Sequence, residues 1–285
     1  MENNFLSVKI LVLSSFLSFL IILFAYISFA NKFKTVVVFC NVGQGDATYI
    51  RVKNKIDILI DAGPNNAILN CLGKYMPFYD REIEIALMSH PQKDHIGGFL
   101  PVLQRYRVDK FIMTKIDNPI NLFSQLKTII KMKNIPVLFA NSDLKFNISG
   151  DSFEILWPTE RFINENKQSS LDLNYFSIIA VFKENTFRVL FTGDVPPQIL
   201  NRLLNQSDLE STILKVPHHG SKNGLTAAFL KAADPKVSVI SVGKNNSYGH
   251  PSKEILEMLK TSKTWIRRTD LEGDIVIKIP NLNDQ

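Results

Sequence analysis

The stretch Ser89-His90-Pro91-Gln92-Lys93-Asp94-His95 directly follows a β-rich run and leads into a predicted helix. A loop at that point places its side chains at the carboxyl end of a strand, where α/β folds expose reactive groups. His90, Asp94 and His95 can therefore converge on one point. Asp94 and His95 project in different directions, so one loop could supply ligands to two neighbouring metal positions.

A purely structural interpretation of this loop treats Asp94 as the N-cap of a helix and the two histidines as solvent-facing turn residues. Capping explains one residue and leaves two histidines unexplained. Gly97 and Gly98 would also be a costly start for an ordinary helix. Close backbone packing around the loop explains them better, since glycine has no side chain.

The other histidines lie in two further polar motifs. The chain has five histidines, and the remaining three stand in Val216-Pro217-His218-His219-Gly220-Ser221 and in Tyr248-Gly249-His250-Pro251. Each motif follows a predicted strand. Imidazole is the commonest metal ligand and the commonest general base near neutral pH. This confinement predicts one assembled reaction centre.

One carboxylate motif, Phe191-Thr192-Gly193-Asp194, ends another predicted strand. Its aspartate stands before a Pro-Pro helix start. Asp194 is therefore either a helix cap or a carboxylate directed into the centre, and the motif alone leaves both open.

Strands and helices alternate around these motifs. Three β-rich runs separated by glycine-bearing turns predict an antiparallel opening meander at 35–40, 47–52 and 55–60. Further strands are expected at 83–88, 108–113, 153–157, 176–182, 187–192, 212–216, 236–242 and 274–279, with helices near 66–75, 95–105, 119–133, 197–205, 224–232 and 252–260. The pattern is a mixed α/β architecture without a second catalytic domain.

An apolar segment precedes this architecture. Residues 10–27 hold no charged side chain, and the apolar run extends to residue 30. A run of about 18 residues or more can span a bilayer as a helix. We expect residues 1–34 to be a membrane anchor, in contact with the membrane through residues 10–30, and residues 35–285 to be the catalytic domain.

A cleavable signal peptide is the alternative for this segment, because Ser28 and Ala30 are small residues suited to a cut. The flanking cations Lys9, Lys32 and Lys34 leave the positive-inside preference nearly undecided. The short start of the chain looks like the first part of an export signal. We therefore expect the domain to lie outside the cytoplasm.

Charge adds little about partners. The chain carries 33 basic and 27 acidic side chains, a net charge of +6 at pH 7. This mild excess would suit a polyanion such as nucleic acid, but many proteins without such a partner carry as much.

The two cysteines, Cys40 and Cys71, lie in apolar surroundings. Buried thiols are expected rather than a reactive pair. A bond between them would require the fold to bring them together.

Seven ordered motifs resemble the metallo-β-lactamase-like domain of the ComEC competence proteins. The motifs are Asn41-Val-Gly-Gln-Gly-Asp-Ala47, Leu59-Ile-Asp-Ala-Gly63, the loop from His90 to Gly98, Thr192-Gly-Asp194, Val216-Pro-His-His-Gly-Ser-Lys222, Gly249-His-Pro-Ser252 and Arg268-Thr-Asp270. The resemblance covers residues 35–280. It implies a four-layer αβ/βα sandwich, here preceded by one N-terminal transmembrane helix, with a metal centre at one edge of the paired sheets.

The resemblance also implies roles for single residues. The implied metal ligands are His90, Asp94, His95, Asp194 and one or both of His218 and His219. Asp94 or Asp194 would orient or deprotonate water, while His250 and Lys215 would neutralise charge on a phosphate. Residues expected to bind substrate or support the site are Asp46, Asp61, Gln92, Asn174, Lys215 and Ser221. Asp61 would hold the loop from His90 to Gly98, the metal loop, through hydrogen bonds.

Two ligand positions depart from the superfamily pattern. Gln92 stands where most members have histidine, and a neutral amide oxygen is a poorer ligand for a transition metal. No histidine lies between positions 96 and 217, so the middle histidine of the superfamily has no counterpart. We expect one tightly held divalent ion, zinc or manganese, and a second that is labile or absent.

The activity implied by the resemblance is metal-assisted hydrolysis of DNA phosphodiesters in a DNA-uptake context at the bacterial cell membrane. A bound divalent ion would acidify water and polarise the electrophilic oxygen. With one predicted span, the chain either works beside a separately encoded ComEC-like channel or is a free-standing anchored hydrolase. The alternatives are a hydrolase of a small ester, lactam or nucleotide, and a catalytically weak binding domain.

Overall fold

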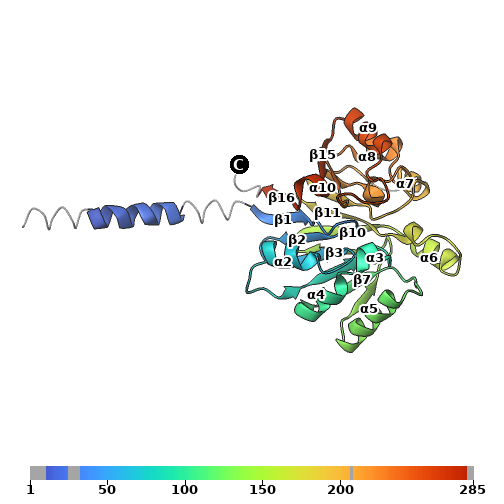
Figure 1. The fold of residues 1–285 in the computed structure, drawn as a ribbon, viewed down its shortest axis with the longest axis horizontal. Helices are drawn as coiled ribbons and strands as arrows, with labels where there is room; N and C mark the ends of the chain where they lie inside the picture. The colour runs from blue at the N-terminus through green and yellow to red at the C-terminus, as the bar shows by residue number, and fades with distance from the viewer. Residues whose placement is uncertain (1–10, 25–32, 206–207, 281–285) are drawn as a thin grey trace, which may run out of the picture.

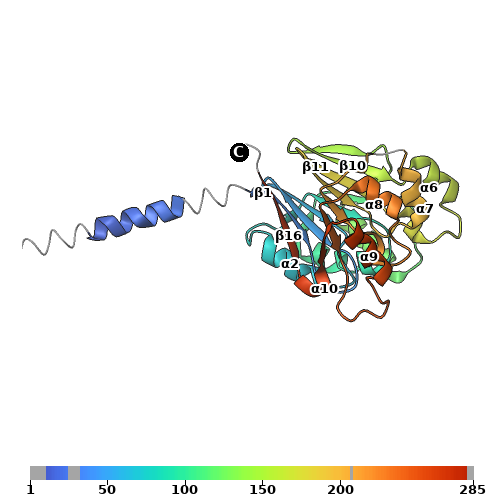
Figure 2. The ribbon, with the colours of Figure 1, turned by 90° about the horizontal axis from the view of Figure 1, so that it is seen from above.

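The computed structural model describes residues 11–24, 33–205 and 208–280. Two seven-stranded sheets pack face to face, and helices cover both outer faces (Figure 1). The same layers are seen from above in Figure 2. The mixed α/β, four-layer sandwich expected from the sequence is confirmed.

The first sheet has the strand order β16-β1-β2-β3-β5-β7-β8. Its strands are β1 (Phe33–Phe39), β2 (Thr48–Val52), β3 (Ile56–Ile60), β5 (Ile85–Met88), β7 (Phe111–Met113), β8 (Val137–Phe139) and β16 (Ile275–Pro280). The pairs β1–β2 and β2–β3 are antiparallel, which confirms the opening meander. From β3 to β8 the pairing is parallel, so these strands end at one edge of the sheet.

The second sheet has the order β15-β14-β13-β12-β11-β10-β9. Its strands are β9 (Lys145–Ile148), β10 (Asp151–Trp157), β11 (Ile179–Glu184), β12 (Phe187–Phe191), β13 (Ile213–Lys215), β14 (Val237–Ile240) and β15 (Trp265–Arg268). Strands β12 to β15 are parallel. Their carboxyl ends also gather at one edge.

Helices on the outer faces bury one stripe each. The first sheet carries α2 (Ile68–Tyr75), α4 (Phe99–Arg105) and α5 (Asn121–Met132), and the second carries α6 (Glu160–Asn166), α7 (Pro197–Leu203), α8 (Ala227–Ala233) and α9 (Lys253–Thr261). The remaining elements are β4 (Glu82–Ile83), β6 (Arg107–Val108), α3 (Lys93–Ile96), α10 (Thr269–Glu272) and the 3-10 helices η1 (Leu173–Phe176) and η2 (Pro217–Gly220). In α5 the buried residues Phe123, Leu126 and Ile130 follow helical spacing.

The core between the sheets is built from the inward faces of both. Phe39 and Ile58 of the first sheet and Phe182 and Val189 of the second are fully buried there. Burial of each such side chain contributes about 1.5–3 kcal/mol. This packing fixes the two sheets relative to each other and so fixes the edge where their parallel strands end.

The helix predicted near 95–105 is divided into α3 and α4 at Gly97 and Gly98. A Cβ on Gly97 would clash with the Pro64 carbonyl, and one on Gly98 would clash with the Ala62 carbonyl. Both glycines therefore pack against the turn that follows β3, which confirms the close approach inferred for them.

The sequence did not predict β8, β9, β15, α6 or α10. The three strands among them lie at sheet edges, and much of their surface is exposed. An edge strand needs no regular alternation of buried and polar residues, so the pattern that marks a half-buried strand is weak there.

The cysteine prediction is wrong in one respect: both side chains are buried, but they are bonded. Cys40 follows β1 and Cys71 lies in α2, and they form a disulfide with a Cα–Cα distance of 5.8 Å. The packing of α2 against the end of β1 brings together residues that are 31 positions apart. The disulfide ties α2 to the start of the loop that carries Asp46.

The N-terminal segment is described only in part. Residues 11–24 are helical with exposed apolar side chains. Among the described residues, no helix has both the length and the apolar character that a bilayer crossing requires. Residues 1–10 and 25–32, including the cleavage positions Ser28 and Ala30, lie outside the described residues. The anchor and the signal peptide stay predictions.

Candidate metal centre

The predicted site residues meet at the edge where parallel strands of both sheets end. His95 follows β5, Asp194 follows β12 and His219 follows β13. All three side chains are at most 2% exposed. The two sheets thus bring together segments that lie up to 124 positions apart.

Two imidazole nitrogens and two carboxylates face one another. His219 Nε2 lies 3.2 Å from Asp94 Oδ2 and 3.3 Å from Asp194 Oδ2. His95 Nε2 lies 3.3 Å from Asp194 Oδ2 and 3.8 Å from Asp94 Oδ2. Metal bonds of about 2.0–2.1 Å in a tetrahedron place neighbouring ligand atoms about 3.4 Å apart. The four residues therefore fit a divalent ion.

The second nitrogen of each histidine is held by a neighbour. His95 Nδ1 lies 2.8 Å from Asp61 Oδ2, and His219 Nδ1 lies 2.9 Å from the Ser241 carbonyl oxygen. A proton on each Nδ1 is donated to these acceptors, so the lone pair of Nε2 is directed into the cluster. Asp61 also accepts hydrogen bonds from the Ser89 backbone N–H and hydroxyl, both at 2.7 Å. Asp61 thus makes hydrogen bonds to the loop from His90 to Gly98, as the family resemblance implies.

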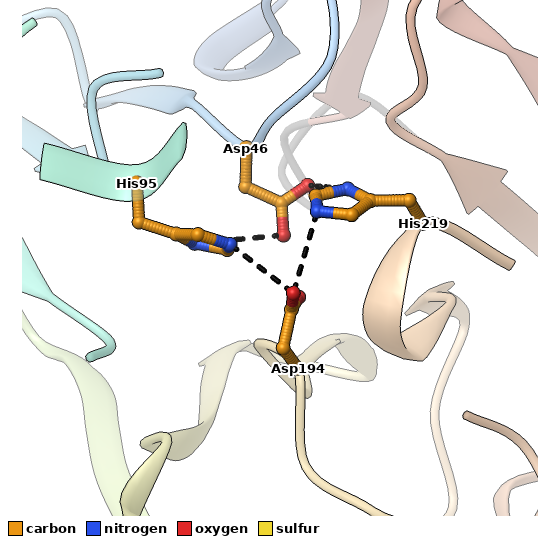
Figure 3. Close-up of side chains that lie close together, drawn as sticks. All are labelled: Asp46, His95, Asp194 and His219. Atoms are coloured by element: carbon orange, nitrogen blue, oxygen red, sulfur yellow. Dashed lines mark ion pairs between the residues drawn. The ribbon is translucent and has the colours of Figure 1, made fainter. Parts of the chain in front are cut away.

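Asp46 lies on the other side of the two histidines. Figure 3 shows it together with His95, Asp194 and His219, whose ligand atoms lie within 4.8 Å of one another. Its oxygens approach the Nδ1 atoms, at 3.5 Å from His219 and 4.0 Å from His95. Each Nδ1 already has an acceptor, so Asp46 is a neighbour of the two histidines on their Nδ1 side and not one of the four proposed ligands. There it forms an ion pair with Lys215.

The loop that carries Asp46 packs directly on the metal loop. The Asp46 backbone N–H donates to the Asp94 carbonyl oxygen at 3.2 Å. Gly45, at φ +142°, has no room for a Cβ because the same carbonyl occupies the space. The glycine in this motif is therefore required by the close approach of two loops.

Lys215 is buried beneath the cluster. Its side chain is 4% exposed, and its ammonium lies 3.7 Å from Asp194 Oδ1 and donates to the Gly193 carbonyl oxygen at 3.2 Å. Burial opposes its charge, but Asp46 and then Asp194 raise the pKa of Lys215 above its usual range. Lys215 is therefore a buried cation whose described partners are carboxylates and a backbone carbonyl.

Charges within the cluster stabilise one another. Burial would lower the pKa of His95 and of His219, but the surrounding carboxylates, Asp194 first among them, together outweigh burial and raise the pKa of both. Burial would raise the pKa of Asp194, but His219 and His95 hold it well below the usual range. Protons and a divalent ion compete for the same Nε2 atoms.

A second metal position would have fewer donors. His90 is fully buried, and its Nδ1 lies 3.0 Å from Ser89 Oγ and 3.3 Å from Ser177 Oγ. Burial and the neighbouring His95 lower the pKa of His90 to about 4, so it is neutral. Its Nε2 is buried and has no hydrogen-bond partner among the described residues. The Gln92 amide contacts Asp172 at 3.5 Å.

The geometry distinguishes the two late histidines. His219 belongs to the cluster, whereas His218 Nε2 lies 4.0 Å from Asp194 Oδ2 and its side chain is 31% exposed. Both residues have positive φ, at 50° and 53°. This turn separates their rings by 6.2 Å at an angle of 79°. Sequence alone had left the choice between them open.

Three further predicted residues are not among the four clustered side chains. His250 stands beside His218 with a ring separation of 6.1 Å, and burial, then His219 and His218, lower the pKa of His250. Asn174 is buried in η1. Ser221 accepts a hydrogen bond from the Asn223 backbone N–H at 3.4 Å, so it stabilises the turn after η2.

The capping alternatives do not describe the two aspartates. The N-cap of α3 is Gln92, and Asp94 faces His219 from within the helix. The N-cap of α7 is Pro196, two positions after Asp194.

Three serines in the site were missed from the sequence: Ser89, Ser177 and Ser241. The Ser177 hydroxyl accepts from the Asp194 backbone N–H at 3.0 Å. Ser89 could have been found because it adjoins His90 at the strand end. Ser177 and Ser241 carry no motif signal.

The chain is similar over most of its length to competence and recombination proteins. It is 24% identical over 263 residues to ComE operon protein 3 of Bacillus subtilis, which covers 85% of this chain and 32% of that protein. It is 30% identical over 246 residues to Recombination protein 2 of Haemophilus influenzae, and this alignment covers 82% of this chain and 28% of that protein. The chain thus spans about a third of the length of the curated relatives it matches. No family model matches it.

Solved structures share the fold. The metallo-β-lactamase-fold protein YhfI from Bacillus subtilis aligns with a TM-score of 0.58 at 11% identity, covering 86% of this chain and 100% of that one. The short form of human tRNase Z aligns with a TM-score of 0.51 at 12% identity, covering 87% and 100%.

Proposed function

We propose that this chain, which is similar to competence proteins and has the metallo-β-lactamase fold, is a metal-dependent phosphodiesterase that cleaves DNA at a membrane. The observation that carries the proposal is the convergence of His95, His219, Asp94 and Asp194 at ligand-like distances. Two relatives are named for competence or recombination, which supports DNA as the substrate. A solved neighbour is described as a diphosphatase of the PhnP family and another as tRNase Z, which supports a phosphoester.

The chain's own residues divide the work of hydrolysis. His95, His219, Asp94 and Asp194 would hold a divalent ion, which supplies Lewis acidity toward water and a phosphoryl oxygen. Asp94 has a side chain that is 33% exposed, so it orients the attacking water and accepts its proton. His250 is neutral near pH 7 because its pKa is lowered, and it donates a hydrogen bond to a phosphate oxygen.

A nuclease assay with manganese or zinc tests the activity. The wild-type chain should cleave DNA, whereas Asp94→Asn and His95→Ala should lose cleavage and bound metal together. Asp109→Asn is the matched control. This partly exposed aspartate precedes β7, at the end of the strand opposite to the site. Among the described basic residues, its salt bridge is with Arg107 at the surface. Cleavage that persists unchanged in both site variants would remove the site assignment.

Salt dependence distinguishes DNA from a small neutral substrate. A DNA enzyme neutralises phosphates with basic side chains, so its affinity should fall steeply as salt rises. Hydrolysis of an ester or lactam should change little. No hydrolysis with any metal or nucleic acid would favour the binding-domain alternative.

Metal analysis tests the proposed occupancy. One equivalent should bind tightly, because the first position has four ligands, whereas the second has only His90 and Asp194 Oδ1, an oxygen that also faces the Lys215 ammonium. Two strongly bound equivalents per chain would contradict this asymmetry. Comparing zinc with manganese in the same measurement would identify the preferred ion.

We propose further that residues 10–30 anchor the chain and that the domain lies outside the cytoplasm. The buried disulfide between Cys40 and Cys71 supports this side, because disulfides persist in oxidising compartments. A compartment reporter fused after residue 285 should be active only outside. Free thiols in freshly isolated protein together with a cytoplasmic reporter signal would overturn the assignment, and co-purification would test for a separately encoded channel partner.

A further inference from the structure

A row of three aromatic rings leads from the metal centre to the surface. His218 lies 4.0 Å from Asp194, and its ring is 6.1 Å from that of His250. The Tyr248 ring lies 5.8 Å from the His250 ring, with the two planes at 18°. Tyr248 is 70% exposed. One face of this tyrosine is therefore stacked on a site residue while most of the ring is open to solvent.

The loop that carries Tyr248 is held in place by one amide side chain. Asn246 Nδ2 donates to the carbonyl oxygens of Gly243 and His250, at 3.0 and 2.7 Å. Its Oδ1 accepts from the backbone N–H groups of Tyr248 and His250, at 3.2 and 3.0 Å. The tyrosine is thus pre-positioned, so binding a ligand against it costs little ordering entropy.

A second contact joins this loop to the interior of the site. The Gly243 backbone N–H donates to Gln44 Oε1 at 3.1 Å. Gln44 belongs to the loop of Asp46, which packs on the metal loop through the Asp94 carbonyl. The exposed ring is therefore fixed relative to the metal centre through residues of both sheets.

An exposed, rigid ring stacked beside a phosphodiester site suits a flat aromatic ligand joined to a phosphate. We propose that Tyr248 stacks an unpaired nucleobase next to the phosphate at the metal centre, which makes single-stranded DNA the preferred form of the substrate. This inference rests on the proposed function. In a duplex each base already stacks on its neighbours, so its face is not available to the tyrosine.

Binding by the full chain to a fluorescent single-stranded oligonucleotide tests the proposal, using a phosphorothioate backbone that resists cleavage. Loss of one base–aromatic stack should raise the Kd of Tyr248→Ala by about 5-fold to 150-fold. Tyr248→Phe should bind like the wild type, because stacking needs the ring and not the hydroxyl. Metal content should be unchanged in both variants, which shows an intact site.

Tyr79→Ala is the matched control. Tyr79 is 73% exposed, and it lies between α2 and β4, before β5 begins and thus at the end of that strand opposite to the site. Its removal should leave the Kd unchanged. An oligomer of abasic deoxyribose phosphates should bind wild type and Tyr248→Ala equally, and a blunt duplex should show a smaller difference than the single strand.

The proposal is overturned if Tyr248→Ala binds the single strand as tightly as wild type, or if the same loss occurs with the abasic oligomer or with Tyr79→Ala. Hydrolysis is scored separately. Cleavage by wild type without any effect of Tyr248→Ala on binding would refute the stacking role alone. Binding that depends on Tyr248 in a chain that cleaves no DNA would refute the proposed hydrolysis and leave the stacking role standing.

Discussion

Replacing Lys215 with methionine removes a positive charge beneath the metal cluster and keeps a side chain of similar length. The lysine pairs with Asp46 and lies 3.7 Å from Asp194 Oδ1. Removing one partner of a buried ion pair costs about 3–5 kcal/mol, because the other charge stays buried without compensation. We expect the free energy of unfolding of the metal-free chain to fall by that amount.

A double-mutant cycle with Asp46→Asn isolates the pair. The double variant buries two neutral side chains, so its loss should be about 2–4 kcal/mol smaller than the sum of the two single losses. Lys127→Met is the control, since Lys127 pairs with Asp117 at the surface, where the two side chains are 41% and 76% exposed. That surface pair should contribute about 0–1 kcal/mol.

Urea denaturation of the full chain, with chelator and with saturating zinc, measures these changes in the free energy of unfolding. Zinc should stabilise Lys215→Met more than wild type, because the cluster of the variant carries one more uncompensated negative charge. A loss below about 1 kcal/mol for Lys215→Met, or additive losses in the cycle, would refute the reasoning that Lys215 and Asp46 form a coupled buried pair.

Three other perturbations test separate features of the structure. Asp61→Asn should weaken metal affinity about 10-fold to 100-fold in a chelator competition, because it withdraws the acceptor that orients His95, and an unchanged affinity would contradict that role. Replacing Cys40 and Cys71 by alanine should lower the unfolding free energy by about 3–4 kcal/mol for a loop of 31 residues, and reductant should then lower the Tm of wild type but not of the variant. Because the pKa values of His95 and His219 are raised in the folded chain, protonation of these residues stabilises the metal-free fold. This stabilisation is fully present below their unfolded pKa of about 6.5 and is lost as pH rises through the folded pKa. The increase in Tm caused by metal should therefore be larger at pH 8 than at pH 6, and a pH-independent increase would refute this competition.

Strand ends were the part of the fold most accessible from the sequence. The loop from Ser89 to His95 follows a short buried run, and that local pattern located its histidines at a strand end without knowledge of the sheet. The edge strands β8, β9 and β15 gave no such pattern because their exposed residues are not constrained to alternate. Tyr248 was overlooked because a single exposed aromatic residue is common on protein surfaces.

The motifs at predicted strand ends indicated that the histidines gather in one centre, because residue type and strand ends are local properties of the chain. The resemblance of the ordered motifs to a known family, and not a local pattern, implied the sandwich architecture and the weak ligand position at Gln92. Tertiary structure alone decided that His219 rather than His218 joins the cluster, that Cys40 bonds to Cys71, and that Lys215 is buried against Asp46. Each of these outcomes depends on a backbone turn or on the packing of distant segments, and no local pattern encodes the distance between two side chains on different strands.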